Sequence, residues 1–397
     1  MTADSGDSSG EWDDESDDEE RVSEAEVSRA VVTGTDWTTE TILSQLRRGN
    51  IQLNPRFQRR DAWDLTRKSR FIESLLLGLP VPQLVLAEDK SRRGAFIVLD
   101  GKQRLLSLRQ FGAGSSLGGD DNRFEQLRLR GLETRDDLAG MSLASLESDS
   151  SKVDDLNAFM NQPIRTVVVR NWPSEAFLHI VFLRLNTGSV PLSAQELRQA
   201  LHPGPFTDFV DDYSSNSGPI RHALNLKKPD FRMRDVEVAL RFFAFNLFLP
   251  EYRGELKDFL DKATGDLNAQ WDEPGREEHI VNLSKQCDLA VLATFSIFGA
   301  NAFKRWTGEK YIPAFNRAVF DIMTFYLKDP DVRNRAISRA EKVEEAFRKL
   351  CEGNQPFASA LQSTTKTVAA THLRLEAWRD ALETALEIPI PNPFGSR

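Results

Sequence analysis

Residues 95–112, AFIVLDGKQRLLSLRQFG, decide the fold of the N-terminal part of this chain. The apolar run Ala95–Leu99 predicts a buried strand, and Asp100-Gly101 predicts an abrupt turn after it. Apolar residues then recur at helical spacing, at Leu105, Leu108 and Phe111. Gly112 follows them and is suited to ending a helix. The segment therefore predicts a strand, a tight turn and a helix.

The predicted start of this helix is suited to binding an anion. A helix N-terminus presents backbone N–H groups and a partial positive charge. Gly101 lets the backbone approach a ligand closely, while Lys102 and Arg104 carry charges suited to phosphate oxygens. Gln103 can donate or accept a hydrogen bond, and Asp100 can hold Arg104, orient a water molecule or bind a metal ion. Alternatively, the same residue types would occur in a charged turn that is closed by its own salt bridge and binds no ligand.

Strands and helices alternate around this segment up to about residue 202. The elements predicted before it are a helix through Ile42–Leu46, an extended segment at Ile51–Leu53, a helix from an Asp64 N-cap to Gly78, and a strand at Gln83–Ala87. Residues 113–161 carry only weak fragments. The elements predicted after them are a strand at Ile164–Val169, a helix through Glu175–Leu183, and a helix whose capping box pairs Ser193 with Glu196.

The C-terminal half is expected to be helical throughout. Beyond about Pro203 the strand signal disappears, and periodic apolar residues predict helices at 233–249, 255–264, 277–298, 313–327, 338–351 and 366–386. A chain of 397 residues is long enough for two cores. We therefore expect an α+β protein, with an α/β N-terminal domain at 31–202 and an all-α helical domain at 203–390.

Charge is distributed unevenly along the chain. Residues 1–26 contain twelve acidic residues and one basic residue, which contributes −11, whereas the remainder carries 50 basic against 48 acidic residues. Such an acidic tract cannot bury enough apolar surface to fold, so residues 1–30 are predicted to be a disordered tail. The tail either adds solubility or folds back on a basic groove. Residues 46–70 hold eight Lys and Arg against Asp61 and Asp64, which makes this stretch a candidate for gripping DNA.

Two further groups are candidate ligand contacts. Arg56, Gln58 and Arg59 lie in a polar loop, and these residue types bind phosphate, contact DNA or remain in water. The second group holds Asn186 with Gln195, Glu196 and Arg198. Asn186 either contacts a ligand or only forms the turn before Gly188, and Glu196 either contacts a ligand or only completes the capping box.

Several other classes of protein are disfavoured. The five histidines are scattered without an HExxH motif, and no GxxxxGK[ST], GxSxG or GxGxxG pattern occurs. Cys287 and Cys351 have no CxxC partner, so both are expected to be ordinary buried thiols. There is no apolar run of about 18 residues and no basic signal peptide, which predicts a cytoplasmic protein without a membrane partner.

Four ordered segments carry a family resemblance: NPRFQRRDAW at 54–63, FIESLLLGLPVPQLVL at 71–86, VLDGKQRLLSL at 98–108 and FLRLNTGSVPLSAQELRQAL at 182–201. Together they resemble the N-terminal domain family of the GmrSD-type restriction endonucleases, related in fold to ParB and sulfiredoxin. The usual turn of that family is DGQQR, and here Lys102 replaces the first Gln. The His-centred motif of the family's C-terminal HNH nuclease domain is absent, so the chain resembles a stand-alone member.

The resemblance implies a ParB/sulfiredoxin-like α/β domain that binds an NTP in a DNA restriction or phage-defence type system. We expect the nucleotide to be bound by Arg56, Gln58, Arg59, Gly101, Lys102 and Asn186, and its hydrolysis to depend on Asp100, Gln103 and Arg104. Asp100 is also the expected ligand of Mg²⁺. The expected partners are the nucleotide, DNA, and an effector or nuclease encoded nearby. Two alternatives stay open, a non-catalytic DNA-binding or DNA-sensing protein and a ParB-like DNA nuclease.

Overall fold

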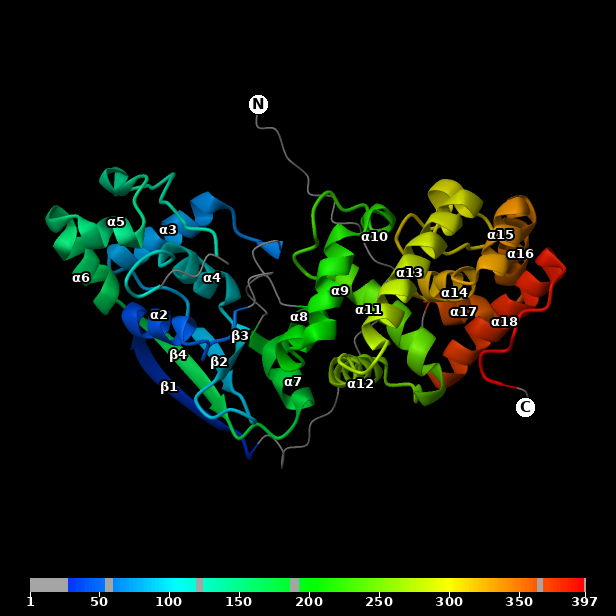
Figure 1. Cartoon of the computed structure of the whole chain (residues 1–397), viewed down its shortest axis with the longest axis horizontal. Coiled ribbons are helices and arrows are strands. Elements are labelled where there is room, and N and C mark those ends of the chain that lie inside the picture. The colour runs from blue at the N-terminus through cyan, green and yellow to red at the C-terminus, as the bar shows by residue number, and fades with distance from the viewer. Residues whose placement is uncertain (1–27, 54–59, 119–123, 186–192, 363–366, 396–397) are drawn as a thin grey trace. The chain divides into compact units, whose positions relative to one another are not determined.

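Four strands form one mixed sheet in the order β1-β4-β2-β3. Their bounds are β1 Val31–Thr38, β2 Leu84–Glu88, β3 Phe96–Asp100 and β4 Pro163–Arg170. β4 pairs antiparallel with β1 and parallel with β2, and β2 pairs antiparallel with β3. The structure is a computed structural model that describes residues 28–53, 60–118, 124–185, 193–362 and 367–395 (Figure 1).

The described residues divide into two compact units, separated in sequence between Leu201 and His202. The N-terminal unit contains the sheet and the helices α2 (Thr39–Arg47), α3 (Leu65–Leu76), α4 (Lys102–Phe111), α5 (Leu143–Ser148), α6 (Val153–Asn161), α7 (Glu175–Leu185) and α8 (Ala194–Leu201). A mixed α/β unit followed by a helical unit confirms the predicted class. The ParB/sulfiredoxin-like topology stays a prediction.

The alternation of side chains along β4 explains why helices pack on both faces of the sheet. Successive residues of a strand point to opposite faces. Ile164 and Val168 belong to a core shared with residues of α2 to α6, which lie on one side of the sheet (Figure 1). Val169 belongs to a second core with Phe177 of α7 and Leu197 of α8. The strand is therefore apolar on both faces, as expected for a strand between two layers.

Capping residues begin several helices where the sequence predicts them. Thr38 caps α2 by accepting a hydrogen bond from the backbone N–H of Thr41. Asp64 caps α3 by accepting from the N–H of Arg67 at 2.7 Å. These caps compensate N–H groups that lack an acceptor inside the helix.

The N-terminal unit differs from the sequence prediction in three places. β1 was not predicted, because it is an edge strand whose valines stay exposed, Val31 by 45% and Val32 by 63%, so no apolar alternation marks it. The extended segment predicted at Ile51–Leu53 adds no strand to the sheet, and only Ile51 forms an isolated bridge, with Phe96. Within the weakly patterned residues 113–161, α5 and α6 form.

The C-terminal unit is helical over its described residues, with one isolated bridge between Trp306 and Tyr311. Its helices are α9 (Pro205–Asn216), α10 (Gly218–Ala223), α11 (Arg234–Phe248), α12 (Leu256–Ala269), α13 (Arg276–Phe298), α14 (Arg317–Leu327), α15 (Pro330–Ser338), α16 (Ala340–Gly353), α17 (Gln355–Gln362) and α18 (Val368–Leu386). The helices α9, α10, α15 and α17 were not predicted. Cys287 and Cys351 are buried free thiols, as expected.

Candidate functional site

Gly101 makes the turn between β3 and α4 possible. Its φ of 97° lies in the left-handed region, and a Cβ atom there would come 2.4 Å from Cδ2 of Leu84. Gly101 is also the N-cap of α4, and no side chain caps the helix. Among the described residues, the N-cap residue therefore offers no side-chain acceptor to the N–H groups of the first turn of α4, and a helix start of this kind can bind an anion.

Asp100 and Arg104 form an ion pair across this turn. The guanidinium of Arg104 donates to Oδ2 of Asp100 at 2.8 Å and to the carbonyl oxygen of Gln83 at 3.0 Å. The second carboxylate oxygen of Asp100 accepts from the N–H of Gly101 at 2.7 Å. Arg104 is buried, and its Nε has no hydrogen-bond partner. The sequence also allowed a charged turn closed only by its own salt bridge. That salt bridge is present, and it fixes the guanidinium of Arg104 at the start of α4.

Lys102 points toward α8. Its ammonium lies 2.7 Å from Oε1 of Glu196, and both side chains are buried. The other carboxylate oxygen of Glu196 accepts from the N–H of Ser193, and the N–H of Glu196 donates to Oγ of Ser193. This reciprocal pair is the predicted capping box. Glu196 thus joins the start of α8 to the start of α4, a contact between residues 94 positions apart that local sequence patterns could not reveal.

Gln103 has an unsatisfied polar atom beside the turn. Its Oε1 is buried and has no hydrogen-bond partner among the described residues. A buried acceptor without a donor costs free energy, on the order of 1–3 kcal/mol, unless a ligand or water supplies the bond.

Polar side chains of α8 are buried in the same unit as this turn. Gln195, Glu196, Arg198 and Gln199 are each at most 6% exposed. The guanidinium of Arg198 donates to Oε1 of Gln195. These polar side chains of α8 are therefore packed inside the N-terminal unit and do not form a solvent-exposed face of the helix.

Four predicted ligand contacts, Arg56, Gln58, Arg59 and Asn186, lie outside the described residues. Their position relative to Arg104 stays a prediction.

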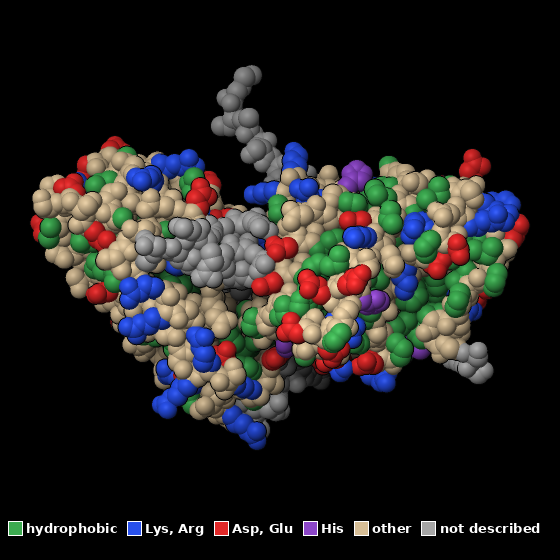
Figure 2. Space-filling model, in the orientation of Figure 1, with side chains coloured by type: hydrophobic (Ala, Val, Ile, Leu, Met, Phe, Trp, Pro, Cys, Tyr) green, Lys and Arg blue, Asp and Glu red, His purple; other side chains and the backbone are tan. Residues whose placement is uncertain are grey.

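The basic stretch 46–70 does not form one exposed basic surface. Arg60 and Lys68 are each 1% exposed, and Lys68 bonds to Asp61 and Gln110. By contrast, Arg47 and Arg48 are exposed at the end of α2. Figure 2 shows Lys and Arg side chains gathered over the part of the N-terminal unit that carries α2, β1 and β2.

The comparison with protein families matches part of the chain, mostly in the N-terminal unit. Residues 39–203 match the family model described as the GmrSD restriction endonuclease, N-terminal domain, and this match covers less than half of the chain. The match includes both β3 and α4, so the turn at Gly101 lies within the matched residues. No curated protein and no solved structure matched the chain. Among the described helices, none is both long enough and apolar enough to cross a bilayer.

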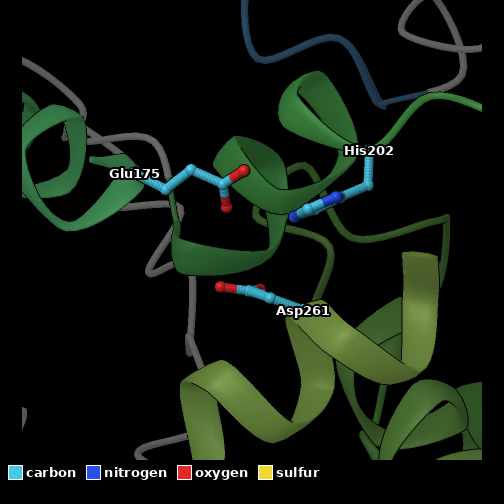
Figure 3. Close-up of side chains that lie close together, drawn as sticks. All are labelled: Glu175, His202 and Asp261. Atoms are coloured by element: carbon cyan, nitrogen blue, oxygen red, sulfur yellow. The ribbon is translucent and has the colours of Figure 1, made fainter. Parts of the chain in front are cut away.

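Within the N-terminal unit, the described residues place no cluster of His, Cys, Asp and Glu side chains around Asp100. Figure 3 labels side chains of both units, Glu175 at the start of α7 in the N-terminal unit and His202 and Asp261 in the C-terminal unit.

Proposed function

We propose that the part of this chain that matches the GmrSD N-terminal domain binds and hydrolyses a nucleoside triphosphate as part of a DNA restriction or phage-defence system. The observation that carries the proposal is the start of α4, where Gly101 leaves the helix without a side-chain cap and Arg104 lies buried at the same turn. Partial positive charge and fixed guanidinium charge together favour a polyanion. The ParB/sulfiredoxin-like topology is part of this proposal.

Each residue of the turn has a role in the proposal. The N–H groups at the start of α4 and the guanidinium of Arg104 hold phosphate oxygens. Gln103, whose Oε1 has no partner, orients the attacking water. Lys102 adds positive charge and anchors the turn to α8 through Glu196. Beyond the described residues, Arg56, Gln58, Arg59 and Asn186 are proposed as further contacts to the nucleotide.

The side chains at the turn fit a magnesium ion that arrives with a nucleotide. Mg²⁺ is usually held by one or two carboxylates together with substrate phosphates and water, so a single carboxylate suffices. Asp100 would hold the ion beside the phosphates, although its two oxygens also bond to Gly101 and Arg104. When bound, Mg²⁺ neutralises charge on the phosphates.

Thermal shift with ATP, GTP, CTP and UTP, each with Mg²⁺, tests the proposal. Binding stabilises the folded chain by about 2.7 kcal/mol at a ligand concentration of 100 Kd. We expect at least one nucleotide to raise the Tm of the wild type, and Arg104→Ala to remove the increase. Because Arg104 also has structural bonds, Gln103→Ala is the second variant, and it should weaken the shift while folding normally.

The exposed Arg130→Ala provides the matched control, because it removes a charge without a side-chain bond. If all four nucleotides leave the Tm unchanged, or if Arg130→Ala reduces the shift as strongly as Gln103→Ala, the proposal is wrong.

A further inference from the structure

Five exposed cations form a basic corner at the end of the sheet opposite the Gly101 turn. They are Arg47 and Arg48 at the end of α2, and Lys90, Arg92 and Arg93 between β2 and β3. Backbone contacts join the two segments, since the N–H of Phe96 donates to the carbonyl oxygen of Asn50 at 2.6 Å. Arg92 also donates to the carbonyl oxygen of Gly49. The five cations therefore belong to one continuous surface.

Carbonyl oxygens, and not carboxylates, position three of the five cations, Arg47, Lys90 and Arg92. Arg47 donates to the carbonyl oxygen of Ser116 at 3.1 Å, and Lys90 donates to that of Pro173 at 3.0 Å. The ammonium of Lys90 also lies 3.8 Å from the ring centroid of Trp172. These contacts order the three side chains without an ion pair to a described carboxylate.

The carboxylates nearest in sequence are engaged with other groups. Oδ1 of Asp89 accepts from the N–H and from Oγ of Ser91, within the same turn. Glu88 pairs with Arg170 and accepts from the N–H of Gly94. Among the described residues, no carboxylate lies within ion-pair distance of any of the five cations.

Two other exposed arginines of this unit form ion pairs. Arg70 pairs with Glu133 at 2.7 Å, and Arg165 pairs with Asp36 at 3.3 Å. The basic corner thus differs from these ordinary surface ion pairs, and it lies in the region where Figure 2 shows Lys and Arg gathered.

We propose that the basic corner binds the sugar–phosphate backbone of double-stranded DNA, separately from the nucleotide turn. Phosphate contacts by exposed Arg and Lys supply most of the affinity of sequence-independent DNA binding. Ordered guanidinium groups suit phosphate oxygens, and they lose less freedom on binding than mobile side chains. The inference does not require that the Gly101 turn binds a nucleotide.

Strand β3 separates the two surfaces. The corner contacts its first residue, Phe96, whereas the nucleotide turn follows its last residue, Asp100. From its first to its last residue, the strand spans about 13 Å at roughly 3.3 Å per residue. The proposed DNA contacts therefore use other residues than the nucleotide turn does.

The double variant Arg48→Ala/Arg93→Ala tests the proposal, because neither side chain makes a hydrogen bond or ion pair with a described residue, and both are exposed. DNA affinity of the full chain is measured by fluorescence anisotropy with a labelled duplex between 50 and 200 mM salt. Each phosphate contact contributes about 0.9 to the slope of log Kobs against log[salt], so losing two should reduce the slope by about 1.8. The affinity ratio of wild type to variant should then shrink about 12-fold over this fourfold salt range.

The control Arg128→Ala/Arg130→Ala removes the same charge from another exposed segment, which contacts α3 through the N–H of Arg130. We expect it to keep the wild-type slope, and the Arg48/Arg93 variant to keep any nucleotide-induced Tm shift. Equal slopes for both double variants, or no DNA binding by the wild type, would overturn the proposal. Binding of a synthetic peptide of residues 1–26 at the corner in place of DNA would also overturn it and would assign the corner to the chain's own acidic segment.

Discussion

Breaking the ion pair between Lys102 and Glu196 should destabilise the N-terminal unit. The variants are Lys102→Met, Glu196→Gln and the double variant. Gln at position 196 keeps the capping box with Ser193, because Gln serves in this motif as well as Glu does. The Glu196→Gln change therefore removes the negative charge while preserving the start of α8.

The expected magnitude follows from burial. The two side chains are only 7% and 6% exposed, so removing one leaves the other charge buried without its partner. Such a loss costs about 3 kcal/mol or more, whereas replacing both charges costs much less than the sum. For a unit of this size, about 3 kcal/mol corresponds to a Tm decrease of roughly 6–12 °C.

Differential scanning calorimetry of the four proteins measures the coupling. We expect a coupling energy of about 2–3 kcal/mol from the double-mutant cycle. Lys262→Met is the matched control, because Lys262 forms ion pairs while 58% exposed and should contribute much less to stability than a buried pair. Additive effects of the two single variants, or a Lys102→Met effect no larger than that of Lys262→Met, would refute the reasoning.

Three further predictions concern other sites. Gly101→Ala should lower the free energy of unfolding measured in urea by at least about 2 kcal/mol, because of the left-handed φ and the contact with Leu84. Gly49→Ala should lower it less, because Gly49 also has a positive φ but has free space around it. Burial raises the pKa of Glu73, but three backbone N–H donors outweigh it and lower the pKa overall. Glu73→Gln should therefore lower the free energy of unfolding by about 2 kcal/mol at pH 7. This difference in stability from the wild type should vanish as the pH falls through the lowered pKa of Glu73, and a difference that persists in acid would contradict the prediction. Burial lowers the pKa of Lys328 to about 8. Between about pH 8 and pH 10 only the unfolded chain still binds this proton, so the wild type should gain stability relative to Lys328→Met as the pH rises through this range. A difference in urea midpoint that does not change with pH would argue against this prediction.

Local signals predicted the centre of the N-terminal unit correctly. The apolar strand, the Asp100-Gly101 turn and the following helix form as the sequence indicates, because each depends on neighbouring residues. The pairing of Asp100 with Arg104 was one of the expected roles of this carboxylate.

Features that depend on distant partners were not predictable in this way. β1 forms because β4, more than 120 residues later, offers it a hydrogen-bonding edge. Lys102 was expected to face phosphate, but its ammonium lies against Glu196, which only the folded chain brings close. Arg60 and Lys68 lie in a stretch rich in basic residues, which is typical of a surface, yet both side chains are buried. The basic corner likewise combines two segments that are more than 40 residues apart.

The central claim is that the start of α4 binds the phosphates of a nucleotide. A crystal structure of the chain with a non-hydrolysable triphosphate and Mg²⁺ tests it most directly. We expect phosphate oxygens about 2.7–3.2 Å from the backbone N–H groups after Gly101 and from the guanidinium of Arg104. A nucleotide bound elsewhere on the chain, with the start of α4 in contact only with solvent, would show that this helix start does not bind phosphate.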